Sequence, residues 1–106
     1  MNTDLQARID DARDTADELA RVIAAEGRDG LLWQQRLQQV AADLAVVGAP
    51  HREVLDAARD RFDRMYAGGR NFSDFHIWRT DPVARVAANE ALSVLVERLR
   101  SLLHAP

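Results

Sequence analysis

Apolar side chains recur at alternating spacings of four and three residues along most of this chain, which is the period of amphipathic α-helices. In the first segment they form one narrow stripe: Leu5, Ile9, Ala12, Ala16, Leu19 and Ile23. Thr3 and Gln6 match a capping box, so a helix is expected to begin there. Gly27 can end it, because glycine adopts the left-handed conformation at no Cβ cost.

The same period, bounded by glycine and proline, predicts three more helices. They are expected over about residues 31–47, 50–67 and 82–103. Asp81 as N-cap and Pro82 in the first helical position mark the last start clearly. Apolar residues cover most of the circumference of the last helix, which is therefore expected to be the central one. We predict an all-α fold, a four-helix antiparallel bundle forming a single domain over residues 1–106, with a long connection between the third and fourth helices.

Composition excludes several classes of function. The chain of 106 residues contains no cysteine, which excludes disulfides, thiolate nucleophiles and cysteine-ligated zinc. Its net charge of −3 gives no general attraction to nucleic acid or to an anionic membrane. The first residues lack the basic and apolar regions of a signal peptide, and no apolar run approaches membrane-spanning length. We expect a cytoplasmic protein that binds neither nucleic acid nor membranes.

Five carboxylates fall on one side of the first predicted helix, opposite its apolar stripe: Asp10, Asp11, Asp14, Asp17 and Glu18. One interpretation is a solvated face, balanced in part by pairs from Asp4 to Arg8 and from Asp17 to Arg21. The other is a docking surface for a basic protein, such as a nuclease domain, whose encounter it would accelerate. Residues 1–30 contain eight acidic and four basic side chains, an asymmetry that favours docking.

Residues that could carry chemistry do not form a recognisable set. The helical carboxylates point away from the apolar stripe, and no Glu-x-x-His spacing occurs, so no metal site is expected. The histidines, at positions 51, 76 and 104, are scattered. Ser73, Asp74 and His76 are close in sequence, but triad partners meet through the fold, and turn chemistry explains the first two. We expect no catalytic residue, no cofactor and no enzymatic activity.

The segment GGRNFSDFHIW, residues 68–78, holds three of the six aromatic residues in a non-helical connection. Its apolar groups either contact a partner or plug the bundle, and the candidate partner contacts are Arg70, Phe72, Phe75 and Trp78. Asn89 lies on the otherwise apolar stripe of the last helix. A buried amide needs partners, and the unpaired backbone groups of this connection are the obvious ones. Asn89 is therefore predicted to be a structural polar anchor, and the alternative is an amide that contacts a ligand.

Two stretches, YAGGRNFSDFHI and ANEALSVLVERL, resemble a small bacterial family of helical proteins. The matching positions are Gly68, Gly69, Phe72, Ser73, Asp74, Asn89, Leu92 and Leu95. Some similar small acidic helical proteins are immunity proteins encoded beside secreted toxins. The resemblance implies a helical fold and a role in binding, and it supplies no catalytic residues.

These observations favour a protein-binding module that neutralises a basic protein partner by occlusion. Its most specific form is an immunity protein against a secreted bacterial toxin, with the acidic face steering the partner and the loop side chains supplying hot spots. The alternative is a self-associating structural or regulatory helical protein, a homodimer that buries the apolar surface of its last helix across a two-fold axis.

Overall fold

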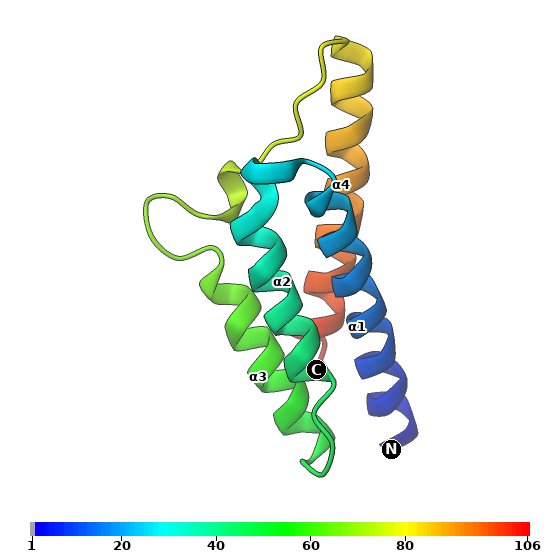
Figure 1. Ribbon diagram of the computed structural model, residues 1–106. Coiled ribbons are helices and arrows are strands. Elements are labelled where there is room, and N and C mark those ends of the chain that lie inside the picture. The colour runs from blue at the N-terminus through cyan, green and yellow to red at the C-terminus, as the bar shows by residue number, and fades with distance from the viewer. Residues whose placement is uncertain (1) are drawn as a thin grey trace.

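The computed structural model describes residues 2–106, with side chains from residue 4 onward. It confirms the all-α four-helix bundle: α1 (Asn2–Ala24), α2 (Leu31–Leu44), α3 (His51–Arg64) and α4 (Pro82–His104). Two short 3₁₀ turns, η1 (Gly27–Gly30) and η2 (Phe72–Asp74), interrupt the connections. Successive helices run in opposite directions, so both termini lie at the same end of the bundle (Figure 1). Arg8 joins the two termini by donating to the carbonyl oxygens of Ala105 and Pro106 at 3.1 and 3.0 Å.

The central helix is α1, which packs against α2, α3 and α4. Its buried stripe alternates alanines, which let neighbouring backbones approach, with Ile9, Leu19 and Ile23. The prediction that α4 would be central is wrong. In α4 the buried residues are Leu92, Leu99 and Leu103, and the remaining apolar residues of that helix are partly or fully exposed.

Helix ends follow local chemistry more closely than apolar content. The carboxylate of Asp81 accepts from the backbone N–H of Ala84 at 3.2 Å with Pro82 in the first turn, which confirms the predicted start of α4. Both α2 and α3 end three residues earlier than predicted. Gly27, with a φ of 68°, takes the left-handed conformation after α1. The predicted capping box depends on the side chain of Thr3, which lies outside the described residues.

The first turns of α4 project beyond the rest of the bundle (Figure 1). None of the residues from 82 to 91 is buried. Val83 and Val86 are 76% and 57% exposed there, and Val94, about two turns beyond Val86, is 68% exposed. The projection therefore presents apolar surface to solvent. Among the described residues, none of the helices combines the length and the hydropathy that a membrane span requires.

Candidate functional site

The connection between α3 and α4 begins with a built turn. Gly68 has a φ of 87°, a conformation that favours glycine. Asn71 caps η2: its side chain accepts from the backbone N–H of Ser73 at 2.9 Å, and its own N–H donates to the carboxylate of Asp74 at 3.2 Å. The N–H of Phe72 then donates to the carbonyl oxygen of Met65 at 2.8 Å, which holds the turn against the end of α3.

Phe72 is part of the core, since only 4% of it is exposed, and its predicted contact with a partner stays a prediction. Its ring lies 5.3 Å from that of Trp33 and 5.8 Å from that of Tyr66, measured between centroids. Phe75 is half-buried and stacks on Phe72 at 6.2 Å. Edge-to-face and offset contacts of this kind stabilise beyond the area they bury. The first aromatics of the connection are therefore a plug for the bundle.

Asn89 holds the connection by hydrogen bonds to the backbone N–H and the carbonyl oxygen of a single residue, Ile77. The N–H of Ile77 donates to Oδ1 of Asn89 at 2.9 Å, and Nδ2 of Asn89 donates to the carbonyl oxygen of Ile77 at 2.9 Å. Nδ2 also donates to the carbonyl oxygen of Arg85 within α4. The predicted hydrogen bonds between Asn89 and the connection are confirmed, and the side chain of Ile77 is buried beside them.

Trp78, the next residue, is 68% exposed. The guanidinium of Arg85 lies over its ring at 4.3 Å from the centroid. Arg79 forms a two-pronged ion pair with Glu26, at 2.8 and 3.0 Å, and this hydrogen bonding lowers the pKa of the Glu26 carboxyl. Ile77 and Arg79, the neighbours of Trp78 in sequence, are both held by hydrogen bonds, and they therefore fix the position of the exposed indole. Of the four predicted loop contacts, Trp78 and Arg70 are the exposed ones.

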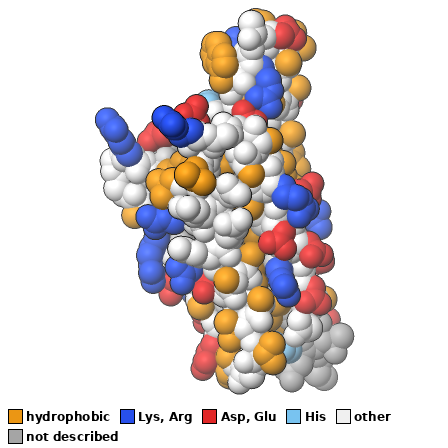
Figure 2. Space-filling model, viewed as in Figure 1, with side chains coloured by type: hydrophobic (Ala, Val, Ile, Leu, Met, Phe, Trp, Pro, Cys, Tyr) orange, Lys and Arg blue, Asp and Glu red, His pale blue; other side chains and the backbone are white. Residues whose placement is uncertain are grey.

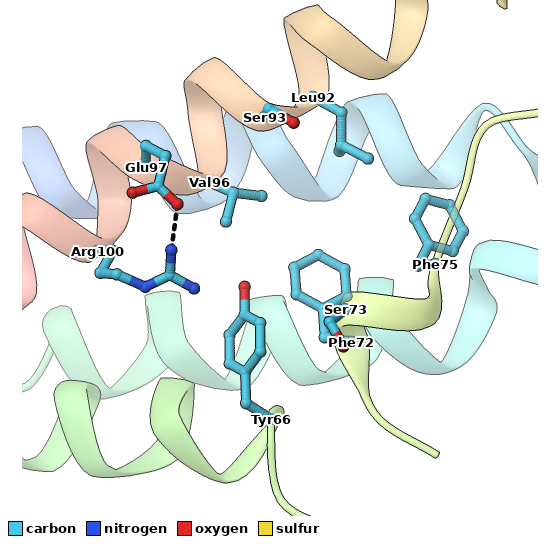
Figure 3. Close-up of a pocket in the computed structure, with 9 residues that line it drawn as sticks. All are labelled: Tyr66, Phe72, Ser73, Phe75, Leu92, Ser93, Val96, Glu97 and Arg100. Atoms are coloured by element: carbon cyan, nitrogen blue, oxygen red, sulfur yellow. Dashed lines mark hydrogen bonds and ion pairs between the residues drawn. The ribbon is translucent and has the colours of Figure 1, made fainter. Parts of the chain in front are cut away.

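A hollow of about 270 Å³ opens between α4, η2 and the residues after α3 (Figure 3). Its lining combines apolar side chains with a polar rim: Tyr66, Phe72, Ser73, Phe75, Leu92, Ser93, Val96, Glu97 and Arg100. Arg100 pairs with Glu97 and lies over the ring of Tyr66, 4.9 Å from its centroid. Burial raises the pKa of the Tyr66 hydroxyl, which the charge of Arg100 partly offsets. The hollow is thus an aromatic recess with charged groups at one end.

The acidic face of α1 lies where the sequence placed it. Asp10, Asp11, Asp14 and Glu18 are exposed and Asp17 is half-exposed, opposite the buried stripe. Among the described residues, none of these carboxylates belongs to an ion pair, and the expected pair from Asp17 to Arg21 does not form. On the α1 side of the molecule, red and blue side chains alternate (Figure 2).

α1 nevertheless accounts for all of the net charge. It contains six acidic and three basic side chains, and the whole chain has a net charge of −3. The other helices and connections are balanced overall. The net negative charge of this protein therefore lies in α1, whose outward face carries five of the six carboxylates of that helix.

Two further groups of residues that the sequence analysis considered can be placed in the described part of the structure. The hydroxyl of Ser73 donates to Asn71 at 2.5 Å, and Nδ1 of His76 lies 3.0 Å from the carbonyl oxygen of Asp74, so this segment forms turn bonds and no triad. No group of three or more histidine, aspartate or glutamate side chains that could hold a metal ion occurs among the residues whose positions are described.

No known protein family, curated protein or solved structure matches this chain. The resemblance to small immunity-type proteins therefore stays a prediction. Sequence reasoning missed the cap at Asn71, although Asn followed three residues later by Asp was a usable signal. It also missed the ion pair between Glu26 and Arg79 and the hollow, for which the sequence holds no local signal.

Proposed function

We propose that this chain is a protein-binding module that neutralises a basic protein partner by occlusion, and that the partner is a toxin domain for which this chain is the immunity protein. The observation that carries the proposal is that α1 has the same net charge, −3, as the whole chain, and that five of its six carboxylates lie on its outward face. Exposed and unpaired carboxylates contribute little to the stability of a fold. Attraction of a basic partner during encounter would account for these carboxylates.

Charge of this kind acts mainly on association. A complementary field raises the rate at which two proteins meet, and it repels anionic substrates of the partner such as nucleic acid. A partner that binds phosphates must carry a basic surface, so the same face that steers it would cover its substrate site. Arg21 lies within this face of α1, which makes the field weaker than that of a continuous acidic strip.

The test is a double charge reversal with a matched control. Asp10→Lys with Asp14→Lys changes the acidic face, and Glu53→Lys with Asp60→Lys makes the same charge change on exposed positions of α3. Each variant is co-expressed with the protein encoded immediately upstream, and the complex is purified by a tag on this chain. We expect wild type and the α3 variant to retain a basic partner and the α1 variant to lose it.

Association rates measured over a series of salt concentrations sharpen this test. The rate for wild type should fall as salt rises, because the field is screened over a Debye length of about 10 Å at 0.1 M. The α1 variant should associate more slowly with a weaker salt dependence. Equal rates and equal retention for both double variants would remove the acidic face from the proposal.

A further inference from the structure

We propose that two copies of this chain pair through the outer face of α4, with Trp78 of each copy seated in the hollow of the other. This inference goes beyond the binding of a basic partner and does not depend on it. It rests on two features of one face that the single chain leaves unused, an exposed indole and an aromatic recess. An isologous two-fold contact joins such a pair of features twice.

Trp78 has the properties of an anchor side chain. One side of its ring is covered by Arg85, and the indole remains 68% exposed. The clamp between Asn89 and Ile77 fixes the preceding residue, so little conformational freedom remains to be lost on binding. Tryptophan and arginine are the residues most enriched in interface hot spots.

The hollow has the size and chemistry of a receptor for one aromatic side chain. Its volume of about 270 Å³ lies below the roughly 300–1,000 Å³ typical of small-molecule sites. Phe72, Phe75 and Leu92 supply apolar contact, while the hydroxyls of Ser73 and Ser93 and the carboxylate of Glu97 can accept from an indole N–H. Figure 3 shows these side chains around the recess.

Both features lie along one side of α4 at a spacing that a two-fold axis can use. Arg85, Asn89, Ser93 and Val96 follow each other at helical intervals of four, four and three residues on that side. Eleven residues separate Arg85 from Val96, about 16 Å along the helix. An antiparallel pairing centred midway between them brings Trp78 of one copy to the hollow of the other.

The charges and valines of α4 agree with this register. Pairing about a point between Glu90 and Ala91 places Arg85 of one copy one position from the level of Glu97 of the other, and Asp81 at the level of Arg100. Opposite charges then share these two levels, while at the axis Glu90 of each copy lies one position from the level of Glu90 of the other. Val86 borders this side of α4 and is 57% exposed, so it adds apolar surface near the contact, whereas Val94 lies farther around the helix.

The contact is small, which predicts weak association. The hollow, Trp78 and the shallow depressions along Pro82–Val94 comprise about twenty residues per copy, at the lower end of the 20–30 residues of a standard interface. None of the residues lining the hollow belongs to α1. The acidic face therefore stays available to a basic partner in the paired form.

Sedimentation velocity of the full chain, from about 10 to about 500 µM, covers the micromolar Kd expected of such an interface. We expect wild type to sediment increasingly as a dimer with concentration. Trp78→Ala, which removes the indole, and Ser93→Trp, which fills the hollow from an exposed position, should each remain monomeric. Val47→Ala, which trims an apolar side chain that is 94% exposed outside α4, should behave as wild type.

Because the chain has no cysteine, one introduced cysteine gives a unique spin-label site. The Ser101→Cys variant, at natural nitrogen abundance, carries the spin label one turn beyond Glu97 and is mixed with ¹⁵N-labelled wild type. Any broadening of a wild-type signal then comes from the label on another copy. We expect the indole N–H signal of Trp78 to broaden, and a label at Val47→Cys to leave it sharp. A monomer at every concentration, dimerisation of Trp78→Ala or of Ser93→Trp, or a sharp Trp78 signal beside the Ser101 label would each overturn the proposal.

Discussion

Asn89→Leu should release the connection from α4 without emptying the space that the amide fills. It removes the two hydrogen bonds, each of 2.9 Å, that pair the N–H and carbonyl of Ile77. A hydrogen bond of this kind contributes about 0.5–1.5 kcal/mol net, so the loss of two is about 2 kcal/mol. The third bond, to the carbonyl oxygen of Arg85, adds little because that oxygen lies within the helix. A loss of 2 kcal/mol corresponds to about a 30-fold easier opening.

Amide hydrogen exchange followed by NMR measures that opening at the residue concerned. The Ile77 amide should exchange about 30-fold faster in Asn89→Leu, because the free energy of the opening that exposes an amide sets its protection from exchange. Asn89→Asp keeps an acceptor for this N–H and loses the donor to the Ile77 carbonyl, so its effect should be intermediate.

Ser93→Ala is the matched control, because Ser93 lies one turn farther along the same side of α4 and its side chain takes no part in the hydrogen bonds of Asn89. Its Ile77 exchange should equal that of wild type. A change of less than about threefold in Asn89→Leu, or about 0.7 kcal/mol, would show that packing rather than the amide holds the connection.

Two further predictions concern the end of α1. A Cβ at Gly30 would lie 2.3 Å from the carbonyl oxygen of Ile23, so Gly30→Ala should destabilise the fold by about 1–3 kcal/mol in urea unfolding. Gly69→Ala is the control, because a Cβ there meets nothing within 4 Å. Equal unfolding midpoints for the two variants would contradict the prediction. Arg79 lowers the pKa of Glu26 from its ordinary 4.5, so the stability that Glu26→Gln removes should be present above pH 4.5 and fade as the pH falls through the lower folded-state value. Thermal unfolding of both proteins from neutral to acidic pH measures it, and a difference independent of pH would refute the assignment.

The sequence predicted the parts of this fold that are fixed within one or two turns of chain. Asp81 and Pro82 mark the start of α4 correctly because capping chemistry involves neighbours in sequence. The apolar period located all four helices for the same reason. Their ends were less certain: Val46 and Val47 extend the apolar pattern of α2, yet both are exposed beyond its last residue.

What the sequence could not predict depends on which faces meet. Apolar content made α4 the expected central helix, but the position went to α1, whose alanines allow close approach on several sides. Phe72 and Trp78 are both large aromatic residues of one connection, and one is buried while the other is exposed. Residues far away in sequence decide that outcome, Trp33 for the first and Asn89 through Ile77 for the second.

The projecting turns of α4 link the fold to both proposed surfaces. Residues 82–91 form the first part of the 23-residue helix α4, and none of them is buried, although Ala88 packs partly against the core. Most of the stability of a helix in a protein comes from tertiary packing. The connection supplies their packing, through Ile77 on Asn89 and Trp78 against Arg85. The same contacts present the indole and leave the valines uncovered. The side chains that hold this end of the molecule in place therefore also expose apolar surface to solvent. A second copy that covers this surface would stabilise the projecting turns further.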